Sequence, residues 1–408
     1  MKRLFILALA AVLTLPAVAR KKEMLPETLP SRQEILQTLE LTNGWFMNKY
    51  ADPAEPTNVK GKVRSSNLWT RAVYYEGLMA LYGIAPRDEY YDYTLRWCDF
   101  HQWKARGENN TAKNGNLARD ADNYCCEQTY IDMYRLEPKP EKLRNVIAHC
   151  DMLVNSPDNS DWWWIDAIQM GMPVLAKLGR TTGDGRYWEK MWLMYEYTRN
   201  QYDGGMWNAE DGLWWRDHDF NPPYTEPNGE DCYWSRGNGW VVAALVRVME
   251  EIGEDGPHYA DYKADLVAMC EALRKVQRAD GYWNCSLHDP DHFGEKETSG
   301  TSLFIYGMAW AVRMGYLPAD EYMPIIGKAW NAMVKHSVHP DGFLGFIQGT
   351  GKEPKDSQPT LYDKAPDFED FGLGCFLLCG TEVYKLSPGE QGAGAKKLEA
   401  LKAKETKK

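Results

Sequence analysis

Apolar residues recur at three- and four-residue spacing along most of the chain, which is the period of an α-helix with at least one buried face. Six such segments share one layout, in which a polar cluster and small residues precede an apolar stretch. They span residues 71–83, 122–134, 166–179, 236–253, 298–315 and 370–386. Six others are more charged and show a single apolar face, and they span residues 31–50, 87–103, 140–154, 185–202, 258–277 and 320–336.

The two kinds of segment alternate along the chain, and this alternation predicts the architecture. Helix hairpins that close into a double ring cover their inner helices on both sides, so inner helices are apolar all round. We therefore predict an all-α fold of twelve helices in one domain, residues 30–387. Asp-Gly followed by aromatic residues predicts hairpin-like loops at the rim of the ring, at 211–216, 280–285 and 341–346.

The polar clusters define where chemistry is expected. If the inner helices run parallel, their N-termini meet at one end of the ring, and their first polar residues converge there. These residues are Arg71, Tyr74, Asp122, Asp166, Arg236, Asn238, Glu297 and Asp370. Unpaired N–H groups and helix dipoles at such an end favour an anionic ligand.

Asp166 is the strongest catalytic candidate, because it follows three tryptophans in DWWWIDA, residues 161–167. A helix N-cap would explain an aspartate here and contributes about 1 kcal/mol. An N-cap, however, needs no aromatic wall. A carboxyl group beside tryptophan rings loses solvation, which raises its pKa and suits it to general-acid catalysis.

Asp122 begins the preceding inner segment and is the second candidate. It could raise the pKa of Asp166 by charge repulsion or bind substrate hydroxyls. Taken by itself, the capping role is favoured for this position, and Asp120 competes for it.

The segment YWSRGNGW, residues 233–240, places glycines on both sides of Asn238 at the start of an apolar helix. The planar guanidinium of Arg236 matches a carboxylate, and Trp234 and Trp240 could flank a sugar ring. The glycines either let a substrate approach the backbone or let neighbouring helices pack closely. The sequence leaves both explanations open.

Charge and the N-terminal segment restrict the class of protein. The net charge of −11 argues against nucleic-acid binding. Residues 1–22 begin with two positive charges, followed by a short apolar run and Ala-Val-Ala, which predicts a signal peptide cleaved near Ala19. No later stretch is apolar enough to span a bilayer. The Lys- and Gly-rich tail, residues 388–408, is predicted to be disordered.

Cysteine and histidine usage predicts no metal centre and no organic cofactor. The nine cysteines include no CxxC pair, so free buried thiols are favoured, although an exported protein could hold one disulfide. No HExxH, GxSxG, Walker A or GxGxxG motif is present. His288 and His292 in HDPDH form a weak metal-site pattern, and solvated loop histidines explain it better.

The chain resembles a known family at several strings, from about residue 35 to residue 386. These strings are WWWIDAIQMGMPVLAKLGRTTGD, YWSRGNGWVVAALVRVME, ETSGTSLFIYGMAWAVRMGYL and GLGCFLLCGTEVYKL. They look like the unsaturated rhamnogalacturonyl hydrolases of glycoside hydrolase family 105, which are related to the unsaturated glucuronyl hydrolases of family 88. The resemblance implies an (α/α)6 barrel of six helical hairpins.

The resemblance also implies a reaction. Such enzymes act on the 4,5-unsaturated uronic acid that a polysaccharide lyase leaves at a chain end. An acid protonates C4 of the vinyl ether, water adds at C5, and the resulting hemiketal opens to release the neighbouring sugar. The rule that relates the spacing of two carboxyl groups to the stereochemistry of ordinary glycosidases does not apply to this reaction. No metal or organic cofactor is needed.

Carried over to this chain, the resemblance assigns roles to named residues. Asp166 falls on the catalytic aspartate, the proton donor and then the base that activates water, and Asp122 falls on the second acidic position. The predicted substrate-binding residues are Tyr74, Trp164, Met170, Arg216, Trp234, Arg236, Asn238, Trp240 and Glu297. One position departs from the pattern: Arg216 stands where relatives often carry a histidine, with His218 two places on. An arginine there could hold an acidic or sulfated neighbouring sugar.

The sequence thus predicts a periplasmic or secreted hydrolase that removes unsaturated galacturonyl groups from oligosaccharides such as rhamnogalacturonan fragments. The alternatives are an unsaturated glucuronyl hydrolase for glycosaminoglycan- or ulvan-type fragments, an ordinary inverting glycosidase, and a carbohydrate-binding barrel without turnover. The expected partner is the oligosaccharide, with no nucleic acid and no membrane span. The chain is expected to be a monomer or a weak homo-oligomer.

Overall fold

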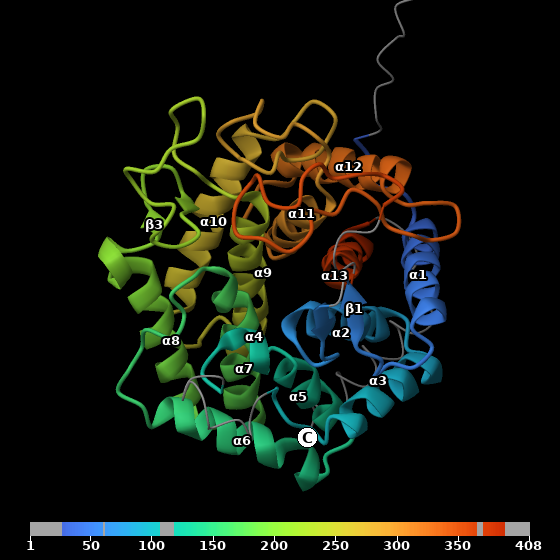
Figure 1. The fold of residues 1–408 in the computed structure, drawn as a ribbon, viewed down its shortest axis with the longest axis vertical. Coiled ribbons are helices and arrows are strands. Elements are labelled where there is room, and N and C mark those ends of the chain that lie inside the picture. Colours follow the sequence, from blue (N-terminus) through green and yellow to red (C-terminus); the bar gives the residue numbers. More distant parts are fainter. Residues whose placement is uncertain (1–26, 60–61, 107–117, 365–369, 388–408) are drawn as a thin grey trace, which may run out of the picture.

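The computed structural model describes residues 27–59, 62–106, 118–364 and 370–387, and in this part of the chain helices dominate (Figure 1). The predicted signal peptide, residues 1–22, and the predicted disordered tail, residues 388–408, lie outside the described residues. Among the described residues, no helix combines the length and apolar character that crossing a bilayer requires.

The predicted inner ring is confirmed. Its helices are α2 (Trp69–Ile84), α4 (Ala121–Tyr124) with α5 (Glu127–Leu136), α7 (Asp166–Thr182), α9 (Ser235–Ile252), α11 (Thr298–Arg313) and α13 (Asp370–Leu386). Each packs against the next, and α13 packs against α2, so the first and last helices close the ring (Figure 1). One segment differs from the prediction, because the expected helix 122–134 is divided at Cys125 and Cys126.

The outer ring is confirmed as well. Its helices are α1 (Arg32–Lys49), α3 (Asp88–Phe100), α6 (Pro140–Val154), α8 (Gly185–Asn200), α10 (Tyr259–Lys275) and α12 (Ala319–His336). Each outer helix has charged residues on the face that is exposed to water. In the inner helix α9, by contrast, all but two residues are buried. The fold is therefore an (α/α)6 barrel.

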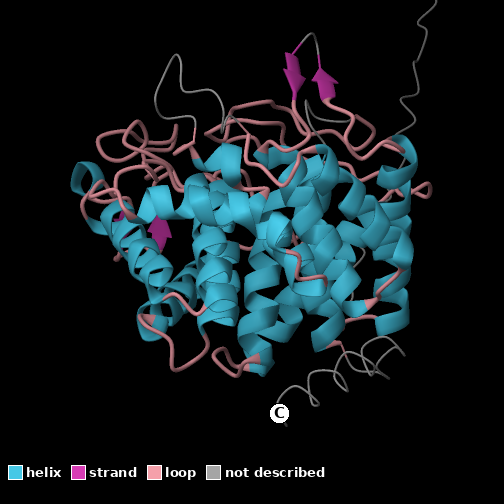
Figure 2. Cartoon of the chain, turned by 90° about the horizontal axis from the view of Figure 1, so that it is seen from below, coloured by secondary structure: helices cyan, strands magenta, loops and turns pink. Residues whose placement is uncertain are grey.

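The inner helices begin at the same end of the barrel. Arg71 of α2 pairs with Asp370 of α13 over 3.1 Å, and Arg236 of α9 lies 3.5 Å from the Ser299 hydroxyl of α11. Both pairs join helix starts. We call this end, with the loops that gather there in Figure 2, the N-terminal rim.

Short strands lie at the rim. β3 (Trp207–Asn208) pairs with β4 (Leu213–Trp214), which confirms the hairpin predicted around 211–216. The predicted loop at 341–346 contains one end of a single bridge, between Val338 and Leu344. The third predicted hairpin, at 280–285, is not formed. A further hairpin, β1 (Thr57–Val59) with β2 (Lys62–Arg64), was not expected from sequence and projects from the rim in Figure 2.

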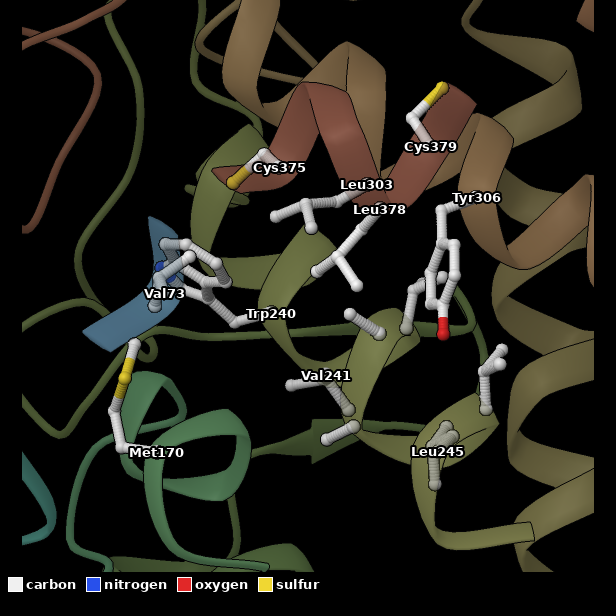
Figure 3. Close-up of a cluster of buried hydrophobic side chains, with 14 of the residues drawn as sticks. Val73, Met170, Trp240, Val241, Leu245, Leu303, Tyr306, Cys375, Leu378 and Cys379 are labelled. Atoms are coloured by element: carbon white, nitrogen blue, oxygen red, sulfur yellow. The ribbon is translucent and has the colours of Figure 1, made fainter. Parts of the chain in front are cut away.

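The core combines close helix contacts with one buried charge network. Figure 3 shows aliphatic and aromatic side chains of α9, α11 and α13 meeting inside the ring. The backbones of α2 and α13 approach so closely that a Cβ on Gly77 would lie 2.6 Å from the carbonyl oxygen of Gly374. In the same interior, the buried carboxylate of Glu76 accepts hydrogen bonds from Arg247 at 2.7 Å and Gln169 at 2.8 Å. All nine cysteines are buried and free, as favoured from sequence.

Candidate active site

Asp166 is the first residue of α7 and is held by an arginine from the rim. The Nε of Arg216 donates a hydrogen bond to its Oδ2 over 3.1 Å. The backbone N–H of Ile165 also donates to the carbonyl of Arg216 over 3.0 Å, so the two segments are joined at both main chain and side chain. Asp166 is 8% exposed, and Arg216 also pairs with Asp217.

Burial and neighbouring charges act in opposite directions on Asp166. Loss of solvation raises the pKa of its carboxyl group, and the positive charges of Arg216 and Arg236 oppose that rise. Asp166 is thus desolvated, and Trp164, two positions before it, is 6% exposed.

Asp122 lies in α4 and interacts with Asp166. Burial, the charge of Asp120 and the charge of Asp166 raise the pKa of Asp122 to about 8, against the smaller effects of Arg216 and Arg64. At neutral pH Asp122 therefore carries its proton. Asp120 accepts the hydrogen bond from the backbone N–H of Asp122, so the capping role belongs to Asp120 and leaves Asp122 available for chemistry.

Arg236 is 1% exposed and is oriented by main-chain acceptors. Its Nη1 and Nη2 donate to the carbonyls of Gln348 and Gly349, each over 2.7 Å. Its guanidinium lies 4.6 Å from the ring centre of Trp234 and 4.9 Å from that of Phe371. The Nε of Arg236 has no hydrogen-bond partner within the described ranges, so one buried donor remains unpaired.

Asn238, predicted to bind substrate, makes hydrogen bonds to the main chain. Its side-chain oxygen accepts from the N–H of Trp214 over 2.9 Å, and its amide nitrogen donates to the carbonyls of Trp214 and Trp234. The amide is fully occupied and buried, so it supports strand β4 on α9 in place of the expected substrate contact.

Glu297 is also a structural residue. It is the N-cap of α11, and its carboxylate accepts from the N–H groups of Ser299 at 3.0 Å and Gly300 at 2.6 Å. The same carboxylate accepts from the Ser299 hydroxyl at 2.6 Å. A carboxylate with these donors is a cap, and not the substrate contact expected from sequence.

Tyr74 points toward the outer ring. It is fully buried, its hydroxyl donates to Asn43 of α1 over 2.9 Å, and its ring lies 4.0 Å from that of Phe46. The substrate contact expected for Tyr74 therefore stays a prediction. Met170 and Trp240 are likewise buried in the hydrophobic core (Figure 3), and Trp240 packs edge-on against Trp69. Met170 and Trp240 act as packing residues in this conformation.

The glycines around Asn238 are explained by packing. A Cβ on Gly237 would lie 2.9 Å from the Trp234 ring and 3.2 Å from Ile165, the residue before Asp166. A Cβ on Gly239 would lie 2.9 Å from Leu303 of α11. Of the two explanations left open by the sequence, close contact between neighbouring helices is the one that the structure supports.

Sequence reasoning missed residues at this site. Arg64 of the β1–β2 hairpin interacts with Asp122, and the main chain at Gln348 and Gly349 fixes Arg236. The string Val-Lys-Gly-Lys-Val could have indicated the hairpin, because a glycine separates two short alternating runs. Trp163 was not predicted as a site residue. It lies three positions before Asp166, and 43% of its surface is exposed.

A surface hollow of about 550 Å³ lies elsewhere, over α1, between Trp45 and Asp341. It contains none of the predicted site residues. The candidate active site is therefore assigned from the interacting carboxyl groups Asp122 and Asp166, because their chemistry is the more specific signal.

Comparison with known proteins places this geometry in a family. A curated relative from Formosa agariphila, named unsaturated 3S-rhamnoglycuronyl hydrolase, is 33% identical over 230 residues. The match covers 55% of this chain and 58% of the relative, so the chain spans little more than half of that protein's length.

Two solved structures are similar over most of the chain. A family 88 glycosyl hydrolase from Bacteroides vulgatus is 29% identical with a TM-score of 0.79, covering 88% of this chain and 100% of that one. A polysaccharide lyase is 28% identical with a TM-score of 0.78, covering 87% and 97%. The sequence model of the family described as "Glycosyl Hydrolase Family 88" matches residues 38–387 of this chain. The chain is a member of glycosyl hydrolase family 88.

Proposed function

We propose that this protein removes a 4,5-unsaturated uronic acid from the non-reducing end of lyase-generated oligosaccharides. The observation that carries the proposal is the pairing of Asp166 with Arg216 beside Asp122, which is protonated at neutral pH. Family membership supports a hydrolase, and the relative from Formosa agariphila bears the name of an unsaturated rhamnoglycuronyl hydrolase.

Asp166 acts first as an acid and then as a base. Its proton goes to C4 of the vinyl ether, and positive charge develops at C5 and the ring oxygen. The resulting carboxylate of Asp166 takes a proton from a water molecule, whose oxygen bonds to C5. The hemiketal formed there opens: the bond from C5 to the ring oxygen breaks, which leaves a ketone at C5 and a hemiacetal at C1. The hemiacetal then collapses to an aldehyde, the bond from C1 to the glycosidic oxygen breaks, and the neighbouring sugar leaves as an alcohol.

Arg216 couples substrate binding to the protonation of Asp166. In the unliganded protein its guanidinium stabilises ionised Asp166. The carboxylate on C5 of the substrate competes for that guanidinium and for the unpaired Nε of Arg236. Once Arg216 turns to the substrate, Asp166 loses its nearest positive charge. Its pKa then rises, which supplies the proton that the reaction consumes.

Asp122 serves as a neutral hydrogen-bond donor. With a pKa of about 8, it donates through its O–H and adds no second negative charge next to the substrate carboxylate. A fully ionised pair would repel the substrate and would oppose protonation at C4. Burial, the charge of Asp120 and the charge of Asp166 favour this protonated state.

The selectivity of the enzyme must come from the neighbouring sugar. Galacturonate and glucuronate differ only at C4, and elimination turns that centre into a flat alkene carbon, so the unsaturated ring is the same from both. We propose rhamnose as the neighbouring sugar, as in rhamnogalacturonan fragments. The name of the Formosa relative makes 3-sulfated rhamnose the direct competitor.

The test is a panel of lyase-digested polysaccharides, followed by the ultraviolet absorbance of the conjugated double bond. Loss of absorbance with release of rhamnose supports the proposal, and comparison of sulfated with unsulfated fragments assigns the neighbouring sugar. A rise in absorbance on intact polysaccharide would show elimination instead of hydrolysis. This outcome is included because one of the similar solved structures is named a polysaccharide lyase. Binding without a change in absorbance would favour a carbohydrate-binding barrel.

We propose export to the periplasm or the medium. Residues 1–22 support this through their signal-peptide composition. N-terminal sequencing of the protein produced by its own host should find a new terminus close to Ala19. Recovery of the full N-terminus from the cytoplasmic fraction would contradict export.

A further inference from the structure

Three clusters of metal-ligating side chains occur among the described residues, and two of them are fully engaged in other contacts. In the first, both ring nitrogens of His149 are occupied, by Glu127 at 2.8 Å and by the carbonyl of Ala118 at 2.6 Å. In the second, around His218, Arg216 pairs with Asp217 and Lys352 pairs with Asp219. Neither cluster offers a free set of ligands.

The third cluster joins two rim segments that lie far apart in the sequence. Glu226 precedes α9, and Asp289 and His292 belong to the loop before α11. One ligand atom from each residue lies within 4.8 Å of the others. Glu226 is 3% exposed and Asp289 is 4% exposed, so both carboxyl groups are buried. The His292 side chain is 20% exposed, so solvent can reach the cluster from its side.

Glu226 has an oxygen that hydrogen bonding leaves unused. Its Oε2 accepts from Nδ1 of His292, but its Oε1 is buried and has no hydrogen-bond partner in the described part of the chain. The Cys232 thiol also interacts with this carboxylate, and a thiol is a weak donor. A buried carboxylate oxygen without a donor costs stability unless a cation satisfies it.

We propose that Glu226, Asp289 and His292 bind one zinc ion. Two carboxylates balance its charge, and the imidazole nitrogen selects a transition metal over calcium or magnesium, which prefer oxygen. Zinc takes the place of the direct contact between His292 Nδ1 and Glu226. A water molecule completes four-coordinate geometry on the exposed side.

The ion acts as a structural link at the rim. The two segments already meet at an antiparallel β-bridge between Trp234 and Ser286. Next to it, the backbone N–H of Ser235 donates to the backbone carbonyl of Cys285 over 2.8 Å. Zinc adds a second connection on the side of Glu226 and Asp289. It thereby fixes the start of α9, which carries Arg236. The proposal concerns stability and metal content, and it does not depend on the proposed reaction.

The experiment uses the full chain without an affinity tag, stripped with a chelator and dialysed with zinc sulfate. Elemental analysis should find one zinc per chain, and thermal unfolding should shift to higher temperature with zinc present. His292→Ala and Asp289→Asn should each abolish retention and the thermal shift. His288→Ala is the matched control, since it lies in the same loop outside the cluster and should retain both.

Isothermal titration of zinc sulfate into the stripped protein should give a stoichiometry of about one ion per chain. Zinc content equal in the wild type and in His292→Ala would overturn the proposal. Retention of calcium in place of zinc would overturn the assigned ion. Because the wild-type protein is measured with and without the chelator, the conclusion does not require any variant to fold.

Discussion

Arg216 donates from its Nε to the carboxylate of Asp166 over 3.1 Å, across 50 residues of sequence. Arg216 is the position at which this chain departs from the family pattern, and Asp166 is the residue on which the proposed reaction depends. The contact joins these two residues. An arginine in this position carries a permanent charge, whereas a histidine would carry one only when protonated. The guanidinium of Arg216 therefore lowers the pKa of Asp166 against the rise that burial causes.

Asp166→Asn is expected to reduce turnover at least ~10³-fold, because an amide neither donates the proton to C4 nor accepts one from water. Substrate affinity should change little, since the side chain keeps its shape. Steady-state rates and equilibrium binding measure the two effects. Asp161→Asn is the control, as Asp161 lies in the same loop and pairs with Arg119 over 2.7 Å. Activity of Asp166→Asn near the wild-type level would refute the acid–base role.

Asp122→Asn should stay within about tenfold of wild-type activity at neutral pH, because both side chains are neutral donors there. In the wild type, kcat/KM should fall as pH rises through about 8, where Asp122 ionises beside Asp166. The variant should lack this fall. Asp120→Asn removes a charge that raises the pKa of Asp122, so it should move the fall to lower pH. An unchanged alkaline limb in all three proteins would contradict this role.

Arg216→Ala should lower kcat/KM by ~10–100-fold, the effect of losing one charge-assisted hydrogen bond to the substrate carboxylate. It should also raise the pKa of Asp166 in the free enzyme, so the pH profile of kcat/KM shifts upward. The sign follows because Arg216 favours the ionised form. Arg186→Ala, on the exposed outer helix α8, serves as the control. A pH profile identical to that of the wild type would argue against coupling.

Asn238→Ala should lower the free energy of unfolding by ~1–3 kcal/mol, because the main-chain groups of Trp214 lose buried partners. Chemical denaturation measures this effect. Loss of activity should accompany the loss of stability, through displacement of Arg216, two positions after Trp214. Unchanged stability together with a large rise in KM would instead assign Asn238 to substrate binding.

Arg247→Met should destabilise the protein by ~3–5 kcal/mol at neutral pH, since the buried carboxylate of Glu76 then lacks its counter-charge. Burial already raises the pKa of Glu76. A carboxyl group with a raised pKa in the folded state costs more stability as pH rises above its unfolded pKa. The deficit should therefore shrink in acid, and Glu76→Gln should rescue much of it. Denaturation at two pH values and a double-mutant cycle test these expectations.

Periodicity was sufficient to predict the ring, because each helix carries its own burial pattern. The predicted bounds of α13, 370–386, coincide with those observed, and α7 begins at the predicted residue, Asp166. The break at Cys125 and Cys126 was not predictable, since both residues are small and apolar and the spacing continues through them. Local pattern specifies a helix but does not specify a short irregularity within it.

The site was predicted less completely, because a polar residue at a helix start can face three ways. Asp166 faces the rim, Glu297 turns back on its own helix as a cap, and Tyr74 points outward to Asn43. Residue spacing does not distinguish these orientations. Arg64 and the carbonyl of Gly349 come from segments without helical period, so nothing in the pattern linked them to the aspartates.

The closure of the ring by α2 and α13 has a consequence for biosynthesis. Arg71 and Asp370 are separated by 299 residues, so their pairing must wait until nearly the whole chain has left the ribosome. Until then α2 exposes an apolar flank that only the last helix can cover. Folding is consequently expected to finish late and in one concerted step, and the nascent chain needs protection from aggregation while it is still incomplete.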